Sequence, residues 1–325
     1  RMGKVYAWSD QPERGMECLE AALPLCQALD DKIAEMDLLN LIGLQFERSG
    51  DYYRLLTEYH QKRLHISREI GHRPIEGGAL MQCGQIQSLY LGDHDAGLAL
   101  LEESLRIQEG TPGAMFTWLR IVQVQVARDR QDEALKALEQ ARRITGARTV
   151  HDMGRAGLRL VSAILYNGLG DEDHLREALE LTAQTSQLVA DAPLTQQYEM
   201  AAACESAAAH LGLAECAAGE TERQAHLDQA LESSQVALDI YQHFGFVQII
   251  ECASEKILYR HSLALAANGR EAEATEYLQR AYDEMKRKHD LIPPDSPFRR
   301  TYIENIPLHH AIRAAHTASK EKRDA

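Results

Sequence analysis

Residues 38–71 read LLNLIGLQFERSGDYYRLLTEYHQKRLHISREIG, and this stretch decides the fold class. Its first half carries apolar residues at helical spacing and ends at the turn signal Ser49-Gly50-Asp51, where glycine tolerates a left-handed backbone. Its second half repeats the helical spacing and ends at Gly71. Two helices of this size cannot bury their apolar faces alone, so the stretch predicts one hairpin of a longer helical array.

Similar turn signals recur along the rest of the chain. They lie at Gly50, Gly92, Arg130, Gly170, Gly219 and Gly269. Their spacings are 42, 38, 40, 49 and 50 residues, which predicts about seven partial or complete hairpins. Residues 121–127, IVQVQVA, alternate like a strand, but a lone strand among helices has nothing to pair with, so we interpret them as helical. Pro24 predicts a kink or a helix end.

Composition restricts the classes of function. The chain has 325 residues, 45% of them apolar, and a formal charge of −14. Its basic runs, residues 286–288 and 320–323, are short and close to acidic residues, so direct nucleic-acid binding is not expected.

No apolar run reaches the ~18 residues of a membrane span. The six cysteines form no CxxC motif and are typical of a reducing compartment. Since Arg1 opens the chain inside an apparent helix, we infer a fragment of a longer cytoplasmic protein.

Sequence motifs for catalysis are absent. The chain has no GxSxG, HExxH, P-loop or glycine-rich dinucleotide signature, and no zinc-like Cys/His pairing. His309, His310 and His316 are interpreted as surface or capping residues of a closing helix rather than as ligands. We therefore expect a protein that is not an enzyme and that needs no cofactor or metal.

Small residues recur seven positions apart in the second helix of five hairpins. The pairs are Gly97 and Ser104, Ala134 and Ala141, Ala178 and Thr185, Ala230 and Ala237, and Ala274 and Ala281. This spacing resembles the tetratricopeptide (TPR) motif, and residues 70–84, IGHRPIEGGALMQCG, resemble the signature between repeats of the long TPR class. Long repeats of this class occur in kinesin light chains, spindle-orientation proteins and bacterial signalling ATPases. The resemblance implies an all-α, right-handed superhelical array over residues 1–290.

The tail breaks the hairpin pattern. Residues 291–297, LIPPDSP, are followed by FRRTYIENIPLHHAI at residues 298–312. This segment resembles the closing segment of helical arrays in bacterial regulators that contain a STAND-type ATPase. We expect residues 291–325 to form capping helices and a frayed end from residue 320. Tyr302, Ile303, Ile306 and Ile312 should pack on the last hairpin, against Leu278, Tyr282 or Met285.

The concave wall is the expected binding surface, because in TPR arrays the first helices line it. The repeat positions select nine side chains for this wall. They are Asp37, Asn40, Glu47, Gln85, Ser88, Arg159, Tyr166, Lys256 and Tyr259. A protein or peptide partner, or a small effector, would bind there; no membrane is expected, and homo-oligomers are possible.

Two functions remain open at this point. One is a ligand- or partner-sensing scaffold within a larger bacterial signalling or transcriptional regulator. The other is a free-standing adaptor for peptide docking or homo-oligomerisation.

Overall fold

The structure is a computed structural model that describes residues 12–147, 151–190, 196–245 and 248–324. The predicted helix stub at residues 1–10 and the predicted break at residues 191–193 lie outside these ranges. Within them, every element is a helix except for one isolated bridge between Ile249 and Cys252. The all-α prediction is therefore confirmed.

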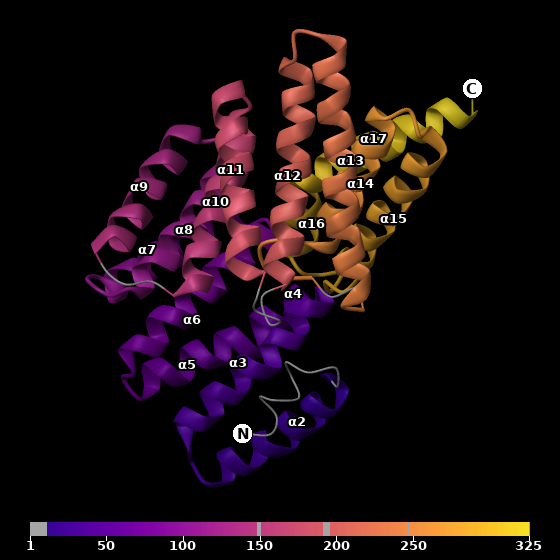
Figure 1. Cartoon of the computed structure of the whole chain (residues 1–325). Coiled ribbons are helices and arrows are strands. Elements are labelled where there is room, and N and C mark those ends of the chain that lie inside the picture. Colours follow the sequence, from indigo (N-terminus) through magenta and orange to yellow (C-terminus); the bar gives the residue numbers. More distant parts are fainter. Residues whose placement is uncertain (1–11, 148–150, 191–195, 246–247, 325) are drawn as a thin grey trace.

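Consecutive helices pack as antiparallel pairs (Figure 1). In chain order the elements are α2 (Pro12–Ala28), α3 (Lys32–Ser49), α4 (Tyr52–Arg54), η1 (Leu55–His60), α5 (Gln61–Glu69), α6 (Arg73–Gln85), η2 (Ile86–Tyr90), α7 (His94–Gln108), α8 (Gly113–Ala127), α9 (Gln131–Ala147), α10 (Asp152–Leu169), α11 (Glu172–Val189), α12 (Gln196–Cys216), α13 (Glu220–His243), α14 (Ser254–Ala267), α15 (Glu271–Asp290), α16 (Phe298–Glu304) and α17 (Pro307–Asp324). The elements η1 and η2 are π-helical segments, each continuous with an α-helix. The strand-like residues 121–127 are helical within α8, and α2 continues through Pro24.

The small-residue pairs lie where neighbouring helices meet. All ten side chains or glycines of the predicted pairs are buried. At Gly97 an added Cβ would lie 2.5 Å from the Cβ of Ser88 on the preceding helix, so the two helices approach too closely for a larger residue. The packing pattern inferred from the sequence is therefore present.

Two hairpin turns contact the far end of the chain. Gly50 and Gly92 have φ angles of 77° and 76°, in the left-handed region that favours glycine. A Cβ at Gly92 would lie 2.2 Å from the carbonyl oxygen of Thr301, and one at Gly50 would lie 2.6 Å from Cε of Lys288. The second and third hairpins thus pack against α15 and α16 through turns that accommodate only glycine.

The tail packs on the last hairpin, as predicted. Tyr302 is buried and donates a hydrogen bond to the carbonyl oxygen of Met285 at 3.2 Å, and Ile306 and Ile312 join the same core. The tail also reaches the third hairpin, which was not predicted: Asn305 Nδ2 donates to the Gly92 carbonyl oxygen at 2.8 Å. In addition, α17 continues as a helix to Asp324, beyond the expected frayed end at residue 320.

These contacts close the array. The largest hydrophobic core combines Tyr52, Leu56 and Ile86 from the early hairpins with Tyr302 and Ile312 from the tail. Side chains of η2, α8, α10 and α14 therefore face the same cavity as side chains of α16 and α17.

Candidate ligand site inside the closed array

A cavity of about 460 Å³ lies inside the closed array, and we call it the inner cavity. Its walls come from η2, α8, α10, α14 and the start of α17. The lining includes Tyr90, Val126, Ile164, Glu251, Glu255, Lys256, Tyr259, Arg260, Pro307, His309 and Ala311. Apolar side chains predominate, and charged groups lie at a few places, which is the usual composition of a small-molecule site.

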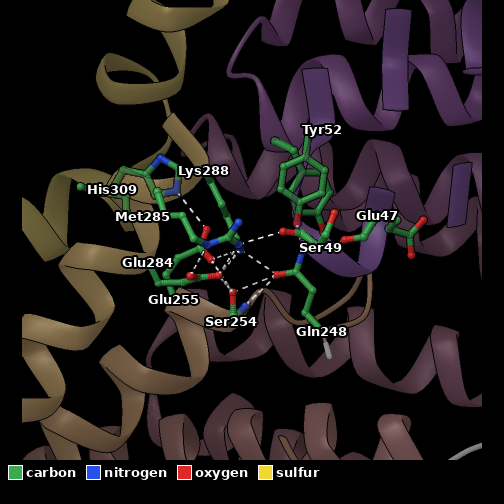
Figure 2. Close-up of polar contacts among 12 residues, drawn as sticks. Glu47, Ser49, Tyr52, Gln248, Ser254, Glu255, Glu284, Met285, Lys288 and His309 are labelled. Atoms are coloured by element: carbon green, nitrogen blue, oxygen red, sulfur yellow. Dashed lines mark hydrogen bonds and ion pairs between the residues drawn. The ribbon is translucent and has the colours of Figure 1, made fainter. Parts of the chain in front are cut away.

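A buried ionic network lies beside the inner cavity and joins both ends of the array; we call it the closing network (Figure 2). It consists of Tyr52, Gln248, Ser254, Glu255, Glu284, Lys288 and His309. The side chain of Lys288 is fully buried, 0% exposed. Its ammonium group donates to the Glu255 carboxylate and, at 2.7 Å, to Oε1 of Gln248.

Gln248 connects the second hairpin to α14. Its Nε2 donates to the Glu47 carbonyl oxygen at 2.8 Å and to the Tyr52 hydroxyl at 2.7 Å. Its Oε1 accepts from the Ser254 backbone N–H at 2.9 Å. A second link is made by Arg287, whose Nη2 donates to the Ser49 carbonyl oxygen at 2.8 Å. Segments about two hundred residues apart are thus held by polar contacts, of which the bond between Gln248 and Tyr52 is buried.

Glu255 is the main anion of the closing network. Burial alone would raise the pKa of this carboxyl, but Lys288 and the hydrogen bond with His309 outweigh burial and hold the pKa well below its usual range. Both ring nitrogens of His309 face acceptors: Nδ1 lies 2.7 Å from the Tyr302 carbonyl oxygen and Nε2 lies 3.3 Å from Glu255 Oε1.

A second ionic group includes Glu251, which also lines the inner cavity. Arg120 Nη2 and Glu251 Oε1 form a buried ion pair at 2.8 Å. Glu47 lies close by, and its pKa is raised to about 7 because burial disfavours its charged form and the negative charge of Glu251 repels it.

This shift predicts a pH dependence of stability. Between about pH 4.5 and pH 7, the folded protein keeps the Glu47 proton that the unfolded chain has lost. Stability therefore falls as pH rises through this window. Glu47→Gln should remove this loss, so that the variant gains about 1–3 kcal/mol over wild type between pH 5 and pH 8. Urea unfolding at both pH values measures the gain. Glu102→Gln, at an exposed site, is the control and should show no such difference.

The predicted groove residues separate into distinct environments. Lys256 and Tyr259 line the inner cavity, and Lys256 forms an ion pair with the buried Glu205. Burial would raise the pKa of Glu205, but Lys256 and Arg260 lower it below its ordinary value. Lys256 and Tyr259 are therefore the predicted groove residues that line the inner cavity.

Three other predicted residues are buried in helix packing instead of facing an open groove. Ser88 is 0% exposed and donates to the Gly84 carbonyl oxygen at 2.7 Å, because α7 packs directly over it. Gln85 is buried, and Tyr166 is buried with its hydroxyl accepting from Arg142 at 2.8 Å. Their projection onto the concave surface is corrected: the repeat register was transferred without knowledge of how closely the hairpins pack.

The remaining four, Glu47 described above among them, do not line the inner cavity. Asp37 is exposed, and Asn40 accepts a hydrogen bond from Gln82 at 2.9 Å. Arg159 donates to the Gln184 carbonyl oxygen at 2.9 Å on α11. Arg159 and Lys256, the two basic residues of the predicted groove, are therefore both already engaged by neighbouring groups.

The closing network was not predicted from the sequence. His309 and His316 are buried, 2% and 6% exposed, so of the two predicted roles, surface or capping, the surface position is wrong for them; His310 is exposed. His316 stacks on Tyr282 with ring centroids 3.9 Å apart. No sequence pattern marks Gln248 or Lys288, since their partners lie far away along the chain.

The described residues contain no group of three or more His, Cys, Asp or Glu side chains arranged to hold a metal ion. No described helix combines the length and the low polarity that crossing a bilayer requires.

The fold of this chain is similar to that of a solved structure. The chain superposes on a Signal Transduction ATPase with Numerous Domains (STAND) protein with a tetratricopeptide repeat sensor from Pyrococcus horikoshii, with a TM-score of 0.53 and 11% identity. The match covers 98% of this chain and 47% of that protein. The chain has a TPR-like fold. It spans about half the length of the STAND protein. No protein-family model and no curated protein sequence matches the chain.

Proposed function

We propose that this chain is the non-catalytic sensing array of a larger bacterial signalling or transcriptional regulator, and that the inner cavity binds the molecule that is sensed. The observation that carries the proposal is a partly open cavity of ligand size that is lined by the middle hairpins, by α14 and by the tail of a TPR-like array. The structural likeness to a STAND protein with a TPR sensor supports the signalling context.

The arrangement of the walls supports a sensing role. Tyr90 comes from the third hairpin, Lys256 from α14 and Pro307 from the tail, so a molecule in the cavity contacts segments that are distant in the chain. A ligand that binds only the closed form stabilises that form by mass action. Binding would then report on closure of the array to the rest of the regulator.

A metabolite library screened by thermal shift tests the proposal. At least one compound should raise the melting temperature of the wild-type chain and should not raise that of Ala311→Phe, which fills the cavity from α17 without changing charge. Ala318→Phe, at an exposed position of the same helix, is the matched control and should respond like wild type.

Two results would overturn the proposal. One is a screen in which no compound distinguishes wild type from Ala311→Phe. The other is a compound that binds the array while ATP turnover by the longer protein stays unchanged, since a sensor must alter the output of its regulator.

A further inference from the structure

We propose that the inner cavity takes an amphipathic monocarboxylate, with its apolar body among the aliphatic and aromatic walls and its acid group bound by Arg260. This inference rests on the proposed function, because both place the sensed molecule in the inner cavity. It adds the chemical class of that molecule and the side chain that selects it.

Three of the four charged groups around the cavity already have a partner. Glu251 pairs with Arg120, whose Nη2 lies 2.8 Å from the carboxylate, and both side chains are buried. Glu255 pairs with Lys288, and Lys256 pairs with Glu205. Within each pair the two charges neutralise each other, so none of these three groups offers a charge for a ligand to complement.

Arg260 is the fourth group: its charge acts on Glu205 at a distance, but it forms no ion pair with any described residue, so Lys256 and Arg260 share one carboxylate and leave one positive charge in excess. It lies on α14 one helical turn after Lys256 and lines the cavity. Its Nε is buried and has no hydrogen-bond partner among the described residues. A buried donor without a partner costs its full desolvation energy, more so when it is charged. A bound carboxylate would supply the missing acceptor, and guanidinium and carboxylate groups match in shape.

The rest of the cavity suits an apolar body. Val126, Ile164, Tyr259, Pro307 and Leu308 contribute aliphatic and aromatic lining. A volume of about 460 Å³ lies within the usual range for small-molecule sites.

The same charges argue against other ligand classes. A cation would need a free carboxylate, whereas Glu251 and Glu255 are both paired. A nucleotide or another polyanion would need several free cationic groups or a glycine-rich loop, and at this cavity only Arg260 is left unpaired among the described residues. A single acid group on an apolar body is the class that fits.

Isothermal titration calorimetry with two probes tests the inference. The probes are 2-naphthylacetate and its neutral amide, 2-naphthylacetamide, which share one apolar body. Wild type should bind the anion at least about tenfold more tightly than the amide, because a charge-assisted hydrogen bond is gained. Arg260→Gln should abolish this preference and leave the affinity for the amide unchanged. Arg260→Lys should keep part of it.

Arg313→Gln is the matched control, since it removes an equal charge from the exposed face of α17 and should leave the preference intact. Equal binding of both probes by wild type, or a preference that survives Arg260→Gln, would overturn the carboxylate inference. The proposed function would still stand if that binding were lost in Ala311→Phe. Absence of binding by either probe would also overturn the inference, and the metabolite screen would decide the proposed function independently.

Discussion

Lys288→Met should destabilise the protein by about 3–5 kcal/mol, because it leaves the Glu255 carboxylate buried without its cation. The side chain of Lys288 is 0% exposed, so water cannot screen the charge that remains. Urea unfolding followed by circular dichroism measures the loss. The double variant Lys288→Met with Glu255→Gln should recover a substantial part of it, since both charges are then removed.

The matched control lies two residues away. Lys286 is exposed on the same helix, and Lys286→Met should change the free energy of unfolding by no more than about 0.5 kcal/mol. A Lys288→Met variant as stable as the Lys286→Met variant would show that the closing network contributes nothing to the fold.

Gly92→Ala should cost about 1–3 kcal/mol more than Gly170→Ala, although both positions occupy the same place in a Leu-Gly-Asp turn. The two glycines have nearly equal φ angles, 76° and 77°, so alanine meets the same backbone strain at each. Only at Gly92 would the new Cβ meet another segment, 2.2 Å from the Thr301 carbonyl oxygen; at Gly170 no atom lies within 4 Å. The difference between the variants therefore isolates the contact between turn and tail.

Thermal unfolding of the two variants measures this difference. Equal melting temperatures would mean that α16 does not press on the third hairpin in solution. A lower melting temperature for Gly92→Ala alone would establish the contact, because both variants add the same methyl group and neither changes the charge.

The hairpins could be predicted from the sequence because their signals are local. Apolar spacing, turn glycines and small residues seven positions apart act within one or two helices, so Ala134 and Ala178 could be placed before the structure was known. The packing of Tyr302 on α15 was also within reach, since an array end needs an apolar cover.

Closure of the array could not be predicted in this way. It depends on pairs such as Gly92 with Thr301, and Gln248 with Tyr52, which lie about two hundred residues apart. Lys288 stands in a basic run that looks like an ordinary exposed helix end, yet only its neighbours Lys286 and Arg287 are exposed. The candidate site was predicted least well, because the tail and the tight hairpins decide which wall residues face a cavity.

Hydrogen–deuterium exchange of the turn at residues 49–54 tests closure of the array most directly. These amides lie more than two hundred residues from Lys288, yet the Gly50 turn packs on the Lys288 side chain. If the closing network holds both ends together, this turn should exchange faster in Lys288→Met than in wild type, and at the wild-type rate in Lys286→Met. Unchanged exchange at residues 49–54 in Lys288→Met would contradict a closed array.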